Sequence, residues 1–417
     1  MKSIIYFVLT GGLLFAQSGI SLASENATEV FFHANSTMHD TQEWPRVAMN
    51  KDGRFMTVWQ SESQEGVNNK LNLYGRMFNN LAEPITTEFK VNDVGDFSSL
   101  AALHYDLDAN SSGKFCIAWG ANGSAGRSAY IRCYNSEGTA VTDILTVDNT
   151  SDAWTEPKVA IEVFEDGSFI VVYQFEVGFT TGLKAVRYNS ENMPGNPFWL
   201  DSEGGWGRSD NVQISGDGNG RIGVTWNIND FNIQTKAAVI DADDSMLVAA
   251  FLVGDSENTR LREEKPDIAM HSDGRFVVSI SQYDRDAYHY DNLQLHFFSA
   301  LGEENLSKVY SSIEERQIKD PRIAANEDNI FISWSASGSS TRGYGDNIKM
   351  MAIDWNGAIT QPEIHINESY ERLNQIDPSI AVNDESIVIA WTDKYREERE
   401  NDDSTLNEGV YGSVGTL

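Results

Sequence analysis

The stretch PRVAMNKDGRFMTVW, residues Pro45–Trp59, places two short apolar runs on either side of an Asp-Gly pair. The second run is β-branched and aromatic and too short for a helix, so we interpret both runs as strands. An Asp-Gly pair between apolar runs is a strong hairpin signal, and it predicts a type I′ turn with positive φ at both central residues. The stretch therefore predicts an antiparallel hairpin.

The same pattern recurs along the chain with a period of about 55 residues, and self-similarity at such a period indicates a repeat architecture. The seven copies are Pro45–Trp59, Pro157–Tyr173, Pro266–Ile280, Pro321–Trp334 and Pro378–Trp391, with degenerate copies at Leu100–Trp119 and Val212–Trp226. A third and a fourth strand follow each hairpin, as at Leu73–Phe78 and Thr87–Asn92. Units of four antiparallel strands at this period are typical of propeller blades, so we expect an all-β fold.

The two ends of the repeat region complement each other. Residues Thr28–Asn35 resemble the fourth strand of a unit, and Gly409–Val414 resemble a third strand. We therefore expect the N-terminal strand to complete the last blade, which removes exposed sheet edges. The prediction is a single seven-bladed β-propeller domain over residues 24–417.

Residues 1–23 have the pattern of a secretory signal peptide. Lys2 precedes an apolar run, and small residues end at Ala23. The run is too short to span a bilayer comfortably, so we expect no membrane insertion. The expected location is the periplasm or the extracellular medium.

The formal net charge is −31. A chain this acidic is a poor partner for nucleic acid, because phosphate binding needs a basic face. Two interpretations remain open: a solvated acidic surface, or selective binding of cations or of a cationic polymer.

The chain has two cysteines, Cys116 and Cys133, in the predicted second and third strands of blade two. If the hairpin turns near residues 121–128, they face each other across the ladder. Export favours a disulfide between them. Two buried free thiols are the alternative.

One acidic stretch suggests a metal. Asp106, Asp108 and Asn110 place oxygen atoms at alternating positions before Gly113, as calcium loops begin. The stretch resembles the calcium loop of integrin-type propeller blades, although Lys114 follows where that pattern has a further ligand. An elongated polar turn is the alternative, and calcium is the only cofactor that the sequence suggests.

The connections that enter each blade, and those between second and third strands, emerge on one face of a propeller. We call this the loop-rich face, and the opposite one, made of Asp-Gly hairpins, the hairpin face. Aromatic rings and Arg groups on the loop-rich face suit sugar binding, since rings stack on sugars and guanidinium groups clamp carboxylates. The candidate ligand-binding residues are Trp44, Trp154, Trp206, Arg208, Arg260 and Arg285. Alternatively, such residues fill gaps between blades or pair with nearby acids.

The repeat resembles one found in tandem in many exported bacterial proteins, with the pattern P-x-V-A-x-x-x-D-G-x-F-V-V-x-W. The resemblance implies a propeller-like, often cell-surface protein without an assigned activity. There is also a distant, fold-level likeness to seven-bladed polysaccharide lyases, which act on uronic-acid polymers with His, Tyr and Arg residues. That likeness implies Tyr283, Tyr288, His289, Arg262 and Arg322 as catalytic candidates.

Two functions follow from these observations. The first is a monomeric binding protein that holds a glycan or a protein partner on the loop-rich face, since the chain carries no G-x-S-x-G, H-E-x-x-H or P-loop motif. The alternative is a lyase, in which Arg262 or Arg322 neutralises a uronate carboxylate. Tyr283, Tyr288 or His289 then removes the C5 proton and assists the leaving oxygen.

Overall fold

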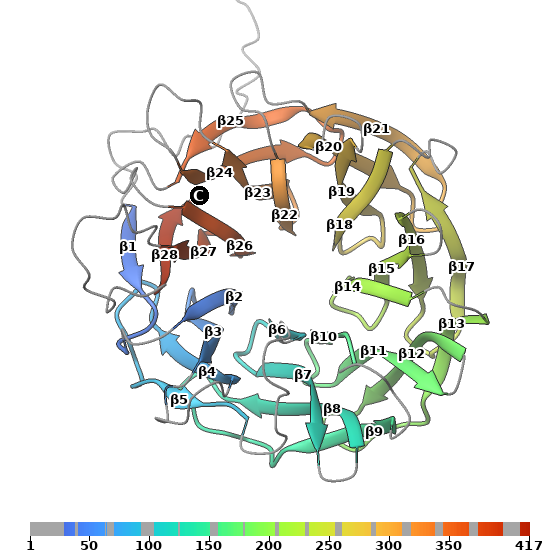
Figure 1. Cartoon of the computed structure of the whole chain (residues 1–417), viewed down its shortest axis with the longest axis horizontal. Coiled ribbons are helices and arrows are strands. Elements are labelled where there is room, and N and C mark those ends of the chain that lie inside the picture. The colour runs from blue at the N-terminus through green and yellow to red at the C-terminus, as the bar shows by residue number, and fades with distance from the viewer. Residues whose placement is uncertain are drawn as a thin grey trace, which may run out of the picture.

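The structure, a computed structural model, is a ring of sheets around a central channel (Figure 1). It describes residues 29–37, 41–62, 64, 71–92, 104–123, 126–150, 157–177, 180–204, 208–229, 233–254, 261–284, 289–310, 318–337, 345–366, 374–394 and 409–417. These residues form seven four-stranded antiparallel sheets, which confirms the predicted all-β, seven-bladed propeller. The described ranges hold no helix that is long and apolar enough to span a membrane. Residues 1–28 lie outside them, so the signal peptide stays a prediction.

Each blade contributes one strand to each of four concentric positions. The innermost strands are β2 (Gln42–Met49), β6 (Tyr105–Ala109), β10 (Val159–Val163), β14 (Arg208–Gly216), β18 (Leu261–Met270), β22 (Ile318–Ala325) and β26 (Asn374–Val382). The second strands are β3 (Phe55–Glu62), β7 (Phe115–Gly123), β11 (Phe169–Val177), β15 (Ile222–Asn229), β19 (Phe276–Asp284), β23 (Asn329–Ser337) and β27 (Ser386–Lys394). The third strands are β4 (Leu71–Phe78), β8 (Gly126–Tyr134), β12 (Thr180–Tyr188), β16 (Ile233–Ile240), β20 (His289–Phe298), β24 (Asp346–Asp354) and β28 (Gly409–Thr416). The outermost strands are β5 (Phe89–Lys90), β9 (Leu145–Thr150), β13 (Phe198–Gly204), β17 (Met246–Val253), β21 (Glu304–Tyr310), β25 (Ile359–His365) and β1 (Val30–His33).

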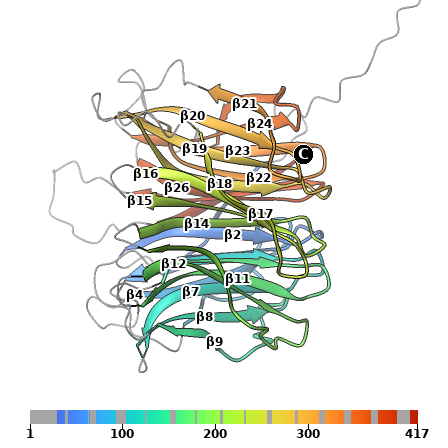
Figure 2. The ribbon, with the colours of Figure 1, turned by 90° about the vertical axis from the view of Figure 1, so that its right-hand side faces the viewer.

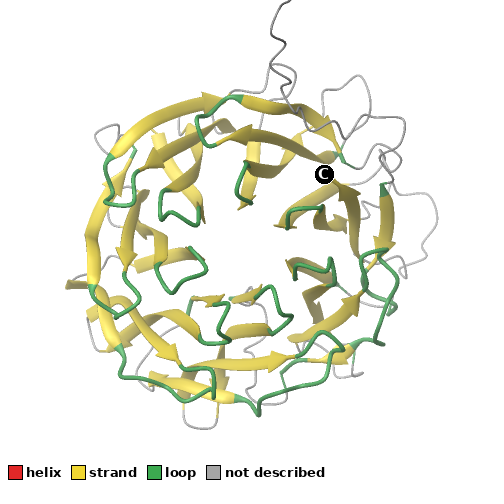
Figure 3. Ribbon diagram, turned by 180° about the vertical axis from the view of Figure 1, so that it is seen from behind, coloured by secondary structure: helices red, strands yellow, loops and turns green. Residues whose placement is uncertain are grey.

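Strands run between the two faces of the ring, as the side view shows (Figure 2). Because an innermost strand enters from the loop-rich face, its first residues lie near that face and its last residues near the hairpin face. The described connections are short and are drawn in green in the view from behind (Figure 3).

The Asp-Gly hairpins differ from the predicted type I′ turns. Of Asp52 and Gly53 only the glycine has positive φ, at 76°, and the N–H of Gly53 donates to the Asn50 carbonyl at 3.1 Å. The Asn50 side-chain oxygen also accepts the N–H groups of Asp52 and Arg54, both at 3.0 Å. The type I′ prediction was wrong because this Asx contact stabilises an ordinary turn that ends in a left-handed glycine.

Most innermost strands carry a β-bulge. On β2, Glu43 and Arg46 pair with Gln60 and Val58 of β3, so β2 holds one extra residue. Blade three lacks the bulge: on β10, Ala160 pairs with Val172 and occupies the position of Arg46. The sequence repeat had aligned Lys158 with Arg46, two residues too early, since the stretch from Ala160 to Asp166 is two residues longer than the one from Ala48 to Asp52.

The core lies between blades. The predicted aromatic residues near the ends of the second strands are all at most 2% exposed: Trp59, Trp119, Tyr173, Trp226, Trp334 and Trp391. Trp59 of blade one packs with Val388 and Ala390 of blade seven, and Trp391 packs with Ile348 of blade six. Six of the seven blades therefore bury a second-strand aromatic residue between blades, and blade five buries Ile280 there, which holds the ring together.

Blade seven is completed by the N-terminal strand, as predicted. Val30 to His33 of β1 pair with Val414 to Tyr411 of β28. Phe32 is 8% exposed, and its ring centroid lies 5.1 Å from that of Phe55 and 5.0 Å from that of Phe78 in blade one. A Cβ at Gly412 would lie 2.3 Å from the Phe32 ring, so only glycine allows β1 this close.

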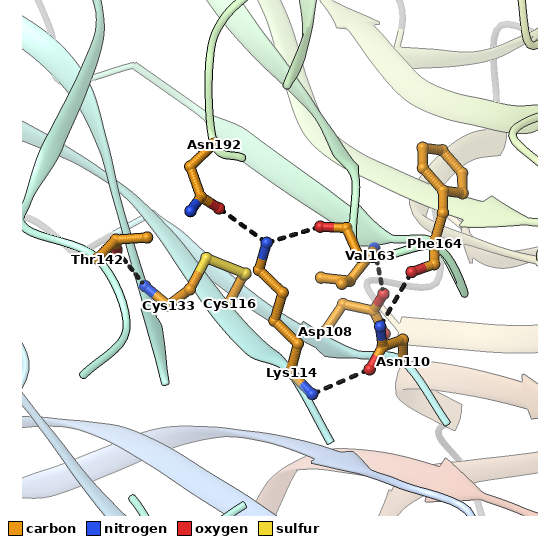
Figure 4. Close-up of a disulfide and its surroundings, with 10 residues drawn as sticks. Asp108, Asn110, Lys114, Cys116, Cys133, Thr142, Val163, Phe164 and Asn192 are labelled. Atoms are coloured by element: carbon orange, nitrogen blue, oxygen red, sulfur yellow. Dashed lines mark hydrogen bonds between the residues drawn. A yellow bond between two sulfur atoms is a disulfide. The ribbon is translucent and has the colours of Figure 1, made fainter. Parts of the chain in front are cut away.

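Cys116 and Cys133 form the predicted disulfide (Figure 4). They are directly opposite each other on β7 and β8, with Cα atoms 4.1 Å apart, and both are fully buried. The N–H of Cys133 donates to the Thr142 hydroxyl at 2.9 Å. The bridge sits in the apolar layer between blades two and three, where it contacts the cluster around Tyr173.

Candidate active or binding site in the channel

The innermost strands surround a cavity of about 290 Å³ at the centre of the ring. Strand register defines two layers of residues in it. The first layer, nearer the loop-rich face, consists of Arg46, Asp106, Ala160, Gln213, Asp267, Arg322 and Ser379. The second layer, two residues further along each strand, consists of Ala48, Asp108, Glu162, Ser215, Ala269, Ala324 and Ala381.

Opposite charges occupy neighbouring parts of the channel wall. Arg46 and Arg322 flank Ser379 of blade seven, whereas Asp106, Asp108 and Glu162 come from blades two and three. The Arg46 guanidinium lies 5.6 Å from the centre of the Tyr105 ring. Burial, and then the charge of Arg322, lowers the pKa of Arg46. The channel therefore has a cationic side at blades six, seven and one, next to an anionic side at blades two and three.

The anionic side chains accept hydrogen bonds from the next blade. Asp106 Oδ2 accepts the N–H of Ile161 at 2.9 Å, and Asp108 Oδ2 accepts that of Val163 at 2.7 Å. Ser379 Oγ likewise accepts the N–H of Val47 at 3.1 Å. These side chains satisfy backbone groups that no strand pairing reaches, because the innermost strands of neighbouring blades belong to separate sheets.

Burial also changes the acidity of these groups. It raises the pKa of Asp108 to about 7, against hydrogen bonds from Val163 and Ala109 that lower it. Burial, followed by repulsion from Asp108, raises the pKa of Glu162 well above its usual value. The two carboxyl groups therefore favour holding a proton between them near neutral pH.

A ring of strained residues marks the end of the channel at the loop-rich face. Trp44, Asn211, Lys265, Asp320 and Asp377 all have φ between 50° and 56°, although none is glycine. Each sits at the bulge of its innermost strand, where the register against the second strand shifts. A left-handed non-glycine residue costs of order 1–3 kcal/mol, and such residues cluster at functional sites.

The ring of strained residues includes charged side chains that interact with one another. Lys265 Nζ lies 2.7 Å from Asp320 Oδ1. Burial, and then repulsion from Asp320, raises the pKa of Asp377 to about 6. Trp44 is half-buried. Its main-chain N–H donates to the Thr392 hydroxyl at 3.0 Å, and its main-chain carbonyl accepts a hydrogen bond from the Tyr105 hydroxyl. The ring thus combines an aromatic residue with both signs of charge at the mouth of the channel.

The predicted site residues fall into three groups. Trp44 lies at the mouth, Arg322 lies in the channel 4.0 Å from Asp267 Oδ2, and Tyr283 is half-buried on β19. Only backbone is described for Arg208, Arg262 and His289. Trp154, Trp206, Arg260, Arg285 and Tyr288 lie outside the described residues.

Backbone pairing brings part of the predicted lyase set together in blade five. Arg262 of β18 is directly opposite Tyr283 of β19. His289 of β20 pairs with Asp284, the residue after Tyr283. The three positions therefore share the loop-rich end of one blade.

The predicted calcium ligands have protein partners. Asp106 and Asp108 hold β10 as described above, and Asn110 Oδ1 accepts the N–H of Lys114 at 2.9 Å. Asn110 Nδ2 donates to the Phe164 carbonyl at 3.0 Å (Figure 4). Within the described part of the chain, no group of three or more His, Cys, Asp or Glu residues is placed to hold a metal. Calcium binding stays a prediction.

Three charged channel residues, Arg46, Glu162 and Asp267, were not among the predicted site residues. A signal for Asp267 was present, because it follows Pro266 where Arg46 follows Pro45 and Arg322 follows Pro321. Glu162 gave no such signal, because it lies on the channel wall only when the sequence repeat is shifted by two residues along β10 to match the strand register.

No protein-family model and no curated protein sequence matches the chain. Solved structures show the same fold. The polysaccharide lyase Uly1 superimposes with a TM-score of 0.54 at 10% identity, over 92% of this chain and 90% of the lyase. The GH93 α-L-arabinofuranosidase of Fusarium graminearum has a TM-score of 0.51 at 10% identity, over 79% of this chain and 99% of that enzyme. The endosialidase of phage phi92 has a TM-score of 0.50 at 10% identity, over 94% of this chain and 69% of that protein. At this identity the likeness concerns the fold.

Proposed function

We propose that this protein is an exported propeller that binds an acidic glycan where the channel opens on the loop-rich face. The observation that carries the proposal is the pair Arg46 and Arg322 on the channel wall of a protein with net charge −31. Guanidinium groups bind planar carboxylates and sulfates through paired hydrogen bonds. An acidic sugar unit matches this chemistry.

Arg46 supports the proposal because it forms no ion pair with a described carboxylate, while Asp106 and Asp377 act on its charge only from further away. Its Nη1 donates to the Pro45 carbonyl at 3.0 Å, and no described carboxylate lies within ion-pair distance of it. A buried cation without a counter-ion favours an anionic guest. Asp106 and Asp108 on the adjoining wall would repel that guest, so its acidic group is directed towards blades six, seven and one.

Trp44 and the strained ring support the position of the site. Trp44 lies two residues before Arg46 on β2, and we propose that its half-buried ring stacks on a sugar ring bound there. Solved structures with this fold include carbohydrate-active proteins, which agrees with a glycan ligand and does not assign one.

A lyase remains the second candidate because Arg262, Tyr283 and His289 occupy neighbouring backbone positions in blade five. In that reaction an arginine, Arg262 or Arg322, neutralises the uronate carboxylate and makes the C5 proton more acidic. One of Tyr283, Tyr288 and His289 takes the C5 proton, and another donates a proton to the leaving oxygen as its bond to C4 breaks. The products are an unsaturated sugar and a free hydroxyl group.

The test is a titration of the purified protein with uronate-containing algal and plant polysaccharides, with neutral polysaccharides as the control. We expect binding of the acidic polymers alone, and a loss of about tenfold in affinity for Arg322→Gln. Arg54→Gln, a change of the same kind on the hairpin face, should leave the affinity unchanged. Equal binding of acidic and neutral polymers, or equal effects of the two variants, would contradict the proposal.

The same samples distinguish binding from turnover. Growth of unsaturated-uronate absorbance makes the protein a lyase, and its absence together with saturable binding makes it a binding protein. Replacing Arg262, Tyr288 and His289 together by Ala should abolish turnover and leave the thermal midpoint nearly unchanged.

A further inference from the structure

Another cavity, of about 240 Å³, lies in blade seven where β1 closes the ring. Its wall includes Phe31, His33, Trp391, Asp393 and Tyr411, which we call the β1 cage. These residues come from β1, β27 and β28, which lie side by side (Figure 1). The β1 cage therefore joins the first and last described strands of the chain.

Strand register places all five side chains on one side of the sheet. Tyr411 is directly opposite both His33 and Trp391. Phe31 and Asp393 are two residues away from His33 and Trp391, and residues two apart in a strand point to the same side. That side faces blade six, since Trp391 packs with Ile348 and Met350 of β24.

The rings surround the cavity from several directions. The rings of His33 and Tyr411 are stacked, with centroids 4.2 Å apart, and Phe31 meets Trp391 edge to face at 6.5 Å. Trp391 is 1% exposed and forms the floor, whereas Phe31 is 39% exposed and forms the rim. The opening is therefore lined by aromatic surface.

One buried carboxylate in the β1 cage has an oxygen atom without a hydrogen-bond partner. Asp393 is 6% exposed, and its Oδ1 has no hydrogen-bond partner. A hydrogen bond from Gln375 lowers its pKa, but burial dominates and raises it to about 6. No cation contributes to that balance. Buried charges in proteins are normally paired, so a partner for this carboxylate is missing.

His33 adds no positive charge. Burial lowers its pKa despite a hydrogen bond with Asn35, so the imidazole is neutral at neutral pH. Its Nε2 atom is buried and also has no partner. Among the described residues that line it, the cage thus offers aromatic faces, one carboxylate and no cationic side chain.

We propose that the β1 cage binds the alkylated ammonium group of a small organic cation. Aromatic rings attract such a cation through their quadrupoles, Trp and Tyr most strongly. Asp393 supplies the counter-charge. A metal ion fits less well, because hard cations need six or more oxygen ligands and the cage offers one carboxylate. The net charge of −31 raises the local concentration of any cation.

The test uses choline and its uncharged carbon isostere, in which a tert-butyl group replaces the trimethylammonium group. Each is titrated into the full chain at constant ionic strength, by calorimetry and by the change in tryptophan fluorescence, to which Trp391 in the floor of the cage contributes. We expect choline to bind about tenfold or more tightly than the isostere, because the two have the same shape and differ in charge. Choline should also raise the thermal midpoint as its concentration rises.

Two variants locate the site, and one serves as the control. Asp393→Asn keeps the shape of the side chain and should weaken choline binding by about tenfold or more without changing isostere binding. Phe31→Ala opens the rim and should weaken choline binding by several-fold, on the order of threefold or more. Asp384→Asn removes the same charge from an exposed position in blade seven and should leave the affinity unchanged.

Four results would overturn the proposal. They are no choline binding by the wild-type chain, equal binding of choline and its isostere, equal effects of the Asp393 and Asp384 variants, and saturable binding of a neutral monosaccharide that Asp393→Asn abolishes. Thermal unfolding of each variant checks that the ring is intact. The site is separate from the channel, so these results do not depend on whether the channel binds a glycan.

Discussion

Asp267 on β18 accepts the main-chain N–H of Ile323 on β22 at 2.9 Å, although the two strands belong to different sheets. The other oxygen of the same carboxylate accepts the N–H of Ile268 at 2.9 Å. Ser379 and Val47 repeat this relationship between blades seven and one. Side chains in the first layer of the channel therefore connect neighbouring blades where strand pairing does not.

Replacing Asp267 by Ala should lower the free energy of unfolding by about 1–3 kcal/mol, because the buried N–H of Ile323 loses its acceptor. Asp267→Asn keeps an acceptor oxygen and should cost less. Chemical denaturation of the two variants measures the difference. Equal losses would show that the charge of Asp267 matters and the hydrogen bond does not.

Asp108→Asn should change how stability depends on pH. The pKa of Asp108 is about 7 in the folded protein, against a usual value of 3.8. Between these pH values the folded state keeps a proton that the unfolded state has lost, so the wild-type free energy of unfolding falls as pH rises. Asparagine has no proton to lose, so the variant should gain stability relative to the wild type as pH rises from about 4 to about 7.

Denaturant unfolding at several pH values across this range tests the Asp108 prediction. A constant difference between wild type and variant would contradict it. Glu162 has a raised pKa of its own, so the stability of the variant should still decline as pH rises, but less steeply than that of the wild type.

Replacing both Cys116 and Cys133 by Ala should lower the free energy of unfolding by about 3 kcal/mol in the chain-entropy estimate. The bridge joins residues 17 apart. Reducing agent should destabilise the wild type and leave the double variant unaffected. Two reactive thiols in the unreduced, denatured wild-type protein would reject the bridge.

Phe32 and Phe31 form a matched pair for testing ring closure. Phe32 is buried against blade one and Phe31 is largely exposed. Phe32→Ala should lower the free energy of unfolding by about 3–5 kcal/mol, as for other buried Phe residues. Phe31→Ala should cost less than about 1 kcal/mol. Similar losses in thermal unfolding would mean that β1 contributes little to the closed ring.

The repeat made the fold predictable because hairpin turns and core aromatics are local signals. Trp59 and its equivalents were predicted to be core residues from their position after a short apolar run. The closing blade was predicted because Thr28–Asn35 resemble a fourth strand and Gly409–Val414 a third strand. The facing cysteines followed from two strands and one turn. All three inferences need only a strand period of two and a blade count.

The sites were harder to predict because they depend on register. Glu162 reaches the channel only because the stretch from Ala160 to Asp166 is two residues longer than its counterpart in blade one, and the sequence repeat placed Ala160 at that position instead. Asp393 and His33 meet only after β1 pairs with β28, so their separation in the chain hides the β1 cage. A one-residue change of register would turn such a side chain to the other face of its sheet.

Pairing of β1 with β28 also determines when the propeller ring can close during folding. Glu29 and Ser413, whose side chains hydrogen-bond at the closing seam, are 384 residues apart in the chain. β1 is the first described strand to be synthesised and β28 is the last. β1 therefore has no pairing partner until β28 has been synthesised and has folded into blade seven. Contacts at such a separation form slowly. The β1 cage exists only after this event, so a molecule bound there binds the closed ring alone and shifts the equilibrium against its opening.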